Sequence, residues 1–127
     1  MEDEFYMEAE SKKYAVRDVL NSIEKRPAIY IATKEKRLDY ACHFIDGWLF
    51  GNKEPIINYK YHMGITQWIC DWILKNKHVD VSHLQYRGHK YIMIYEVTEG
   101  EDEAWELFFK ISYEYLDYLE SKDKIES

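Results

Sequence analysis

Apolar residues recur every three or four positions along three stretches in the first two thirds of the chain. This is the spacing of one face of an α-helix. The pattern therefore predicts helices over 13–25, from a cap at Thr33 to Gly51, and over about 58–76. The first helix is expected to end before Pro27, because a residue that precedes proline is disfavoured in the α conformation.

Two details of the third predicted helix bear on its packing. Trp68 and Trp72 are four residues apart and therefore share a face. Gly64 costs a helix about 1 kcal/mol relative to alanine, unless it allows a neighbouring element to approach closely.

Two further stretches carry weaker patterns. Residues 28–32 follow a proline and are apolar and rich in isoleucine, which predicts an extended segment. In 91–98 a strand would be apolar on both faces, whereas a helix would group Tyr91, Ile94 and Tyr95. We favour a buried helix there, because a lone strand would leave its backbone groups unpaired. The alternative pairs 28–32 with 91–98 as a small two-stranded sheet.

The clearest amphipathic pattern lies towards the C-terminus. The acidic residues at 101–103 suit a helix N-terminus, and the wide apolar stripe that follows predicts a helix over about 101–121. The predicted fold class is a mostly α, single-domain bundle of four to five helices over 1–127, and the minor two-stranded element of 28–32 with 91–98 stays open as an alternative. Residues 1–11 and 122–127 are polar and are predicted to be frayed.

Composition agrees with this fold class and narrows the range of partners. The chain has 127 residues, of which 46% are hydrophobic and 32% are charged, as in an ordinary globular domain. Its 24 acidic residues outnumber 17 Lys and Arg residues, and the net charge of −7 disfavours nucleic acid and favours a basic protein partner. No apolar run approaches the roughly 18 residues that cross a bilayer, and Met1–Glu4 lacks the positive charge of a signal peptide. We therefore expect no membrane association and a cytoplasmic location.

Motifs of enzyme chemistry are largely missing from the sequence. It contains no GxSxG motif, no Walker A loop and no GxGxxG motif. The five histidines lack HExxH or HxxxH spacing, so we expect no metal site and no other cofactor. Cys42 and Cys70 lie within apolar helical patterns, which predicts that they are small buried hydrophobes. The enzymatic alternative is a small hydrolase that uses Cys70 or a pair of carboxylates.

Aromatic residues make up 17% of the chain and include 12 tyrosines. A core of this size has little room to bury every tyrosine hydroxyl with a partner, so several rings are expected at the surface. Together with acidic residues, such rings are typical of a protein-binding face.

A short motif joins the first two predicted helices. Arg26 and Pro27 are followed by Tyr30, and the second helix carries an apolar-Gly-aromatic step at Gly47 within 44–48. Pro27 is expected to break the chain rigidly, Tyr30 to anchor in the core, and Arg26 to cap helix carbonyls. The motif is therefore predicted to be structural rather than a binding site.

This motif resembles one found in immunity proteins of bacterial polymorphic-toxin and contact-dependent growth inhibition systems. The resemblance includes a second run nearer the C-terminus, Asp102-Glu103-Ala104-Trp105-Glu106-Leu107-Phe108-Phe109. The resemblance implies a small helical protein without catalytic activity. Such a protein binds a cognate toxin domain, with a nuclease as the expected toxin, and neutralises it by occluding its active site. The charge of the chain adds the expectation that this partner has a basic surface.

The acidic residues predicted to contact such a partner are Asp39, Asp46, Glu99, Glu101, Asp102 and Glu103. The main alternative function is a small acidic adaptor or regulatory domain, because the same acidic, ring-rich surface would serve another basic protein equally well. The sequence leaves the oligomeric state open.

Overall fold

The computed structural model describes residues 14–31, 35–87 and 90–126, and most of these residues lie in helices. These ranges contain six α-helices, one 3-10 helix and no strand. The helices are α2 (Val16–Lys25), α3 (Pro27–Ile31), α4 (Leu38–Gly51), α5 (Ile56–Lys77), the 3-10 helix η1 (Ser82–Arg87), α6 (Lys90–Glu96) and α7 (Glu101–Glu126). The predicted mostly α-helical bundle is confirmed, and the two-stranded pairing of 28–32 with 91–98 does not occur in the described residues. None of these helices combines the length and the apolar character that a bilayer-crossing segment needs.

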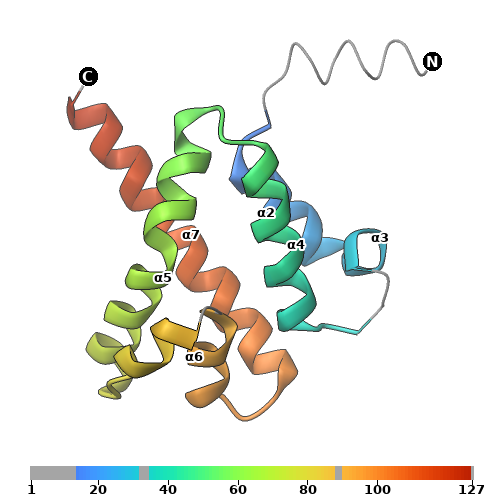
Figure 1. Cartoon of the computed structure of the whole chain (residues 1–127), viewed down its shortest axis with the longest axis vertical. Coiled ribbons are helices and arrows are strands. Elements are labelled where there is room, and N and C mark those ends of the chain that lie inside the picture. The colour runs from blue at the N-terminus through green and yellow to red at the C-terminus, as the bar shows by residue number, and fades with distance from the viewer. Residues whose placement is uncertain (1–13, 32–34, 88–89, 127) are drawn as a thin grey trace.

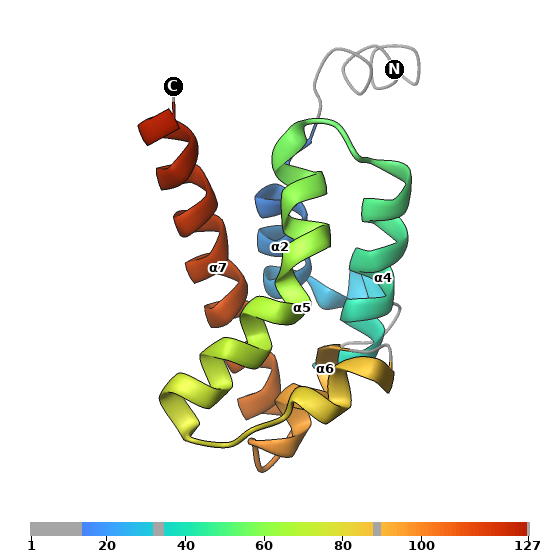
Figure 2. The ribbon, with the colours of Figure 1, turned by 60° about the vertical axis from the view of Figure 1, so that its left-hand side comes forward.

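The two longest helices, α5 and α7, form the centre of the packing. In Figure 1, α2 and α4 lie to one side of this pair, and Figure 2 shows α6 near the end where α5 finishes and α7 begins. The largest fully buried side chains include Trp105, Phe108 and Phe109 of α7 and Tyr61 of α5. The Tyr61 hydroxyl lies 3.0 Å from Oγ of Ser112, so each of these buried hydroxyls has a hydrogen-bond partner.

The segment after α2 differs from its prediction. α2 ends at Lys25 as expected, but residues 27–31 form the short helix α3 and are not extended. Arg26 leaves the helical region, with φ −137° and ψ 63°, in keeping with the restriction on a residue before proline. Pro27 then takes the first position of α3, where its fixed φ suits a helix and its missing N–H is not needed. Ala32, the last residue of the predicted extended segment, lies outside the described residues.

The middle helices agree with the hydrophobic pattern. α5 matches the third predicted helix to within two residues at each end. The preference for a buried helix in 91–98 is confirmed by α6, whose buried residues include Met93 and Ile94. Thr33, the predicted cap of the second helix, lies outside the described residues, and α4 has Arg37 in its cap position.

The C-terminal helix is longer than its pattern predicted. α7 continues to Glu126, whereas the prediction placed its end near 121 and treated 122–127 as frayed. No Gly or Pro follows residue 121, so no local signal stops the helix there. The other segment predicted to be frayed, 1–11, lies outside the described residues.

A buried asparagine that the hydrophobic pattern did not single out fastens the start of α2 to the α4–α5 connection. Oδ1 of Asn58 accepts a hydrogen bond from the backbone N–H of Val16 at 2.7 Å. Its Nδ2 donates to the carbonyl oxygens of Tyr14 and Asn52 at 3.0 Å each, and to that of Glu54 at 3.3 Å. Asn58 is fully buried, so one side chain satisfies backbone groups that would otherwise lack partners.

Candidate functional site

The Arg-Pro-x-x-Tyr motif takes part in the scaffold. Tyr30 is half-buried and packs edge-on against Phe44, with 5.5 Å between the ring centroids. Arg26 closes α2 through its backbone N–H, which donates to the Ser22 carbonyl at 2.9 Å, while its side chain is exposed. Gly47 makes no close approach, because a Cβ at this position would meet no atom within 4 Å. In the structure, Tyr30 therefore contributes to packing, Arg26 caps α2 through its backbone, and Gly47 borders open space.

Three of the six acidic residues predicted to contact a partner are only partly exposed and make internal polar contacts, and Asp46 is the first of them. Asp46 on α4 accepts a hydrogen bond from the ammonium group of Lys90 at the start of α6. The Lys90 side chain is 6% exposed, whereas 37% of the Asp46 side chain is exposed. A buried ammonium group needs a partner of opposite charge, and Asp46 is that partner for Lys90. The Asp46 carboxylate is therefore largely occupied by an internal ion pair.

Asp39 and Glu101 lie beside Arg37, next to the start of α4. Arg37 donates from Nε and Nη2 to the two Asp39 carboxylate oxygens at 3.2 and 3.0 Å. Glu101 accepts hydrogen bonds from the Tyr95 hydroxyl at 2.9 Å and from the Leu38 backbone N–H at 3.4 Å. Partial burial raises the pKa of Asp39, but hydrogen bonds, chiefly from Arg37, outweigh it and hold this pKa below its usual value. Both carboxylates therefore stabilise the start of α4.

The other three predicted acidic residues are exposed where α6 is followed by α7. They belong to a cluster that we call the acidic junction, which consists of Glu96, Glu99, Asp102, Glu103 and Glu106. Within the cluster, the Glu99 backbone N–H donates to the Glu103 carboxylate at 3.2 Å. Lys77 and Lys110 line a shallow depression with Glu103 and Glu106. The structure thus leaves Glu99, Asp102 and Glu103 accessible to a partner.

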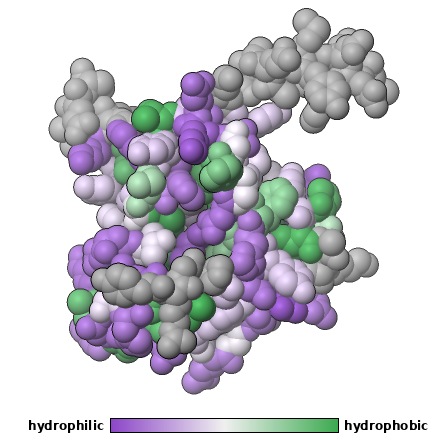
Figure 3. Space-filling view, in the orientation of Figure 1, coloured by the Kyte–Doolittle hydropathy of each residue, from purple (hydrophilic) through white to green (hydrophobic). Residues whose placement is uncertain are grey.

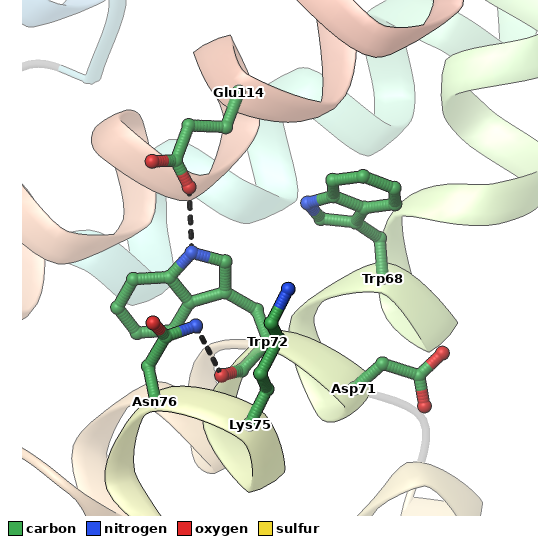
Figure 4. Close-up of a pocket in the computed structure, with 6 residues that line it drawn as sticks. All are labelled: Trp68, Asp71, Trp72, Lys75, Asn76 and Glu114. Atoms are coloured by element: carbon green, nitrogen blue, oxygen red, sulfur yellow. Dashed lines mark hydrogen bonds between the residues drawn. The ribbon is translucent and has the colours of Figure 1, made fainter.

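Rings also gather between α5 and α7, in what we call the α5–α7 groove. Trp68 packs against Tyr115 and Tyr118, with ring centroids 4.9 and 5.0 Å away, and Tyr118 is 47% exposed. A depression of about 450 Å³ in this groove is lined by Trp68, Asp71, Trp72, Lys75, Asn76 and Glu114 (Figure 4). This site was not predicted; the shared face of Trp68 and Trp72 was a signal for it in the sequence, but it was interpreted only as a packing feature. Nothing in the pattern showed which residues of α7 would face them.

The two tryptophans of the groove differ in their hydrogen bonds. Nε1 of Trp72 donates to the Glu114 carboxylate at 2.5 Å (Figure 4). Nε1 of Trp68 is buried and has no acceptor among the described residues. A buried donor without an acceptor costs about 1–3 kcal/mol, so Trp68 has an unmet capacity to donate a hydrogen bond.

Gly64 allows α7 to approach α5 closely beside these rings. A Cβ at this position would overlap the Tyr115 hydroxyl and would lie 2.9 Å from Cζ of the same ring. In the space that the glycine leaves, the Tyr115 hydroxyl donates to the Lys60 carbonyl at 3.2 Å. Close packing therefore offsets the cost of placing a glycine within α5.

Exposed apolar side chains are spread over several elements. Those at least half exposed are Ile29, Phe50, Ile56, Met63 and Leu74. On the face shown in Figure 3, apolar areas are separated by polar ones. The acidic junction and the α5–α7 groove are therefore the more distinctive surface features of the described chain.

The cysteines are poorly placed for chemistry. Cys42 is 1% exposed and Cys70 is 5% exposed, and burial raises the pKa of the Cys42 thiol to about 12. In the part of the chain that the structure describes, no group of three or more His, Cys, Asp or Glu residues is placed to hold a metal ion.

Comparisons with protein-family models, with curated proteins and with solved structures found no match to this chain. Its own surface chemistry is therefore the basis on which a function can be inferred.

Proposed function

We propose that this chain is an immunity protein that binds a cognate bacterial toxin domain, with a nuclease as the expected kind, and blocks its active site. The acidic junction carries the proposal, because its five carboxylates are exposed together on a protein of net charge −7. The resemblance of residues 22–48 and 102–109 to immunity proteins supplies the biological setting. In that setting the protein acts in the cytoplasm and needs no catalytic group.

Long-range attraction would bring the two proteins together. Exposed carboxylates at one end of the molecule attract a basic surface, and such steering raises association rates by about one to three orders of magnitude at low salt. A nuclease suits this mechanism because its substrate site must attract a phosphate backbone. Covering that site excludes the nucleic acid without any covalent bond being made or broken.

The α5–α7 groove would supply the contact that persists after the encounter. An exposed stripe of α7 connects the acidic junction to the groove, and its residues are Glu103, Glu106, Lys110 and Glu114. Half-exposed rings such as Tyr118 are of the residue type that contributes most binding energy at the centre of interfaces. The acidic junction would therefore govern the association rate, and the groove would govern the dissociation rate.

Co-expression tests the proposal. The open reading frame next to this gene is expressed with and without the chain, and growth and complex formation are measured. We expect the intact chain to restore growth. Asp102→Lys combined with Glu103→Lys should slow association about tenfold at low salt. The matched control combines Asp18→Lys with Asp80→Lys, which alters the net charge equally at exposed positions outside the acidic junction and should slow association much less.

Three outcomes decide between the candidate functions. Cell death despite soluble chain would refute toxin neutralisation. Equal slowing by the two charge variants would refute a role for the acidic junction. A pull-down that returns a basic partner without toxic activity would support an acidic adaptor instead.

A further inference from the structure

The indole N–H of Trp68 has no acceptor among the described residues, although Trp68 lines the depression of about 450 Å³ in the α5–α7 groove. Figure 4 shows its nitrogen on the side of the indole that faces Trp72 and Glu114. Trp72 already has Glu114 as its acceptor, so the missing partner is specific to Trp68. Because Nε1 of Trp68 is itself closed to solvent, an acceptor reaches it only after a neighbouring side chain moves. Lys75 lines the same depression and is exposed, and its long flexible chain is suited to such a movement.

The charges around this depression balance. Asp71 and Glu114 contribute two carboxylates, and Lys75 contributes one ammonium group. A second ammonium group, that of Lys110, lies 5.8 Å from the centre of the Trp72 ring. Balanced charge, a wall of rings and an unmet donor together favour a neutral polar group that both accepts and donates hydrogen bonds.

We propose that this depression binds a neutral amide of a partner polypeptide, namely the carboxamide of an asparagine or glutamine side chain. Its oxygen accepts a hydrogen bond from Nε1 of Trp68, and its NH₂ group donates to the carboxylate of Glu114 or Asp71. The planar amide lies against the rings that line the depression. This contact rests on the proposed function, since it needs a protein partner, and it identifies the group of that partner that enters the groove.

Charged groups of similar size fit this depression less well. A carboxylate would accept a hydrogen bond from Trp68 but would face the carboxylates of Asp71 and Glu114. A guanidinium group has only donors and would leave the Trp68 N–H without an acceptor. The depression should therefore select a neutral amide over both.

Three small probes test this selectivity: butyramide, butyrate and butylguanidinium, which share an apolar tail and differ in their head groups. Each is titrated into the isotope-labelled full chain, and the indole N–H signals of its four tryptophans are followed by NMR. We expect butyramide to shift the Trp68 signal saturably, with a dissociation constant of about 10–50 mM, as its few atoms allow. It should bind at least about fivefold more tightly than either charged probe. Tighter binding of a charged probe, or no shift with any probe at about 200 mM, overturns the proposal.

Substitutions then locate the bound amide. Trp68→Phe keeps a ring in the groove but removes the donor, so butyramide should lose its advantage over butyrate, read from the Trp72 signal. Glu114→Gln removes the negative charge that accepts the hydrogen bond from the amide NH₂ group, so butyramide should bind about threefold more weakly or worse. This second variant tests the same site if the Trp68→Phe chain does not fold. The control is Trp48→Phe, because Trp48 lines a different depression with Tyr30. An equal loss in the control variant would place the amide elsewhere and overturn the proposal.

The amide site and the immunity function fail separately. A chain that neutralises the toxin but does not bind butyramide at Trp68 would overturn the amide site alone. A chain that binds butyramide there but leaves the toxin active would overturn the immunity function alone.

Discussion

The packing of α7 against α5 makes a sharp prediction about two glycines in helices. Gly64→Ala would place a methyl group over the Tyr115 hydroxyl and 2.9 Å from Cζ, well inside the roughly 3.5–4.0 Å at which carbon atoms pack. Tyr115 is only 7% exposed and packs against the rings of Tyr61 and Trp68, so a shift of its ring away from position 64 would disturb these contacts. Gly47→Ala is the matched control, because the same methyl group at Gly47 meets no atom within 4 Å.

The magnitudes separate the two substitutions clearly. Overpacking of a core costs about 1–3 kcal/mol, and loss of the hydrogen bond from Tyr115 to the Lys60 carbonyl costs about 1 kcal/mol more. Alanine regains about 1 kcal/mol of helix propensity at either position. We therefore expect Gly64→Ala to lower the free energy of unfolding by about 1–3 kcal/mol, and Gly47→Ala to raise it by about 0.5–1 kcal/mol.

Urea denaturation followed by circular dichroism measures both changes, with the slope of each transition checked against the unsubstituted chain. Combining Gly64→Ala with Tyr115→Phe removes the overlapping hydroxyl, so part of the lost stability should return. If Gly64→Ala stabilises the chain as Gly47→Ala does, the close approach of Tyr115 to Gly64 contributes nothing to stability and the prediction is wrong.

Three other parts of the fold can be tested in the same way. Asn58→Ala should lower the free energy of unfolding in urea by about 3 kcal/mol, because it leaves backbone groups without partners; a change below about 1 kcal/mol would contradict this. Asp46→Asn should cost about 3 kcal/mol, and more than Lys90→Met, because only the first change leaves a buried ammonium group unpaired; the reverse order would contradict this. Burial raises the pKa of the Cys42 thiol to about 12, whereas the thiol of an unfolded chain has a pKa of about 8.5. The stability that the protonated Cys42 thiol contributes is therefore complete below about pH 8.5 and is lost as the pH rises towards about 12. The free energy of unfolding should fall by up to about 1.4 kcal/mol per pH unit in this window, and an unchanged slope in Cys42→Ala would refute that origin.

Helices that bury one stripe were predictable from the sequence, because their periodic pattern is the physical cause of their burial. The choice of helix for 91–98 followed from the cost of unpaired backbone groups, and α6 bears it out. The prediction of an extended segment was wrong for residues 28–31, because it took the break at Pro27 and the β-propensity of Ile29 and Ile31 as signs of extended chain. Proline is also well suited to begin a helix, and in α3 that property decides the conformation.

The candidate surfaces were only partly predictable, because a sequence shows which residues are charged but not which are paired. Asp46 accepts a hydrogen bond from a lysine 44 positions away in the sequence, and Glu101 accepts one from the Leu38 backbone N–H, 63 positions away. Such pairings arise from the packing of whole helices and leave no local signal. Asp102 and Glu103 lie in the first turn of α7, where carboxylates favour the helix dipole, and both are exposed. Glu101 lies in the same turn but is only partly exposed, so a position at a helix start does not by itself show which acidic residue is accessible.

The buried side-chain amide of Asn58 has a consequence for how the molecule opens. Val16 is the first residue of α2, and a backbone N–H at that position has no partner within its own helix and ordinarily exchanges with water quickly. Asn58 accepts this N–H inside the core and also donates to the carbonyl of Asn52, so displacement of this one side chain would release both segments. We therefore expect slow hydrogen exchange at the Val16 amide, because exposure of this N–H requires the contact with Asn58 to break.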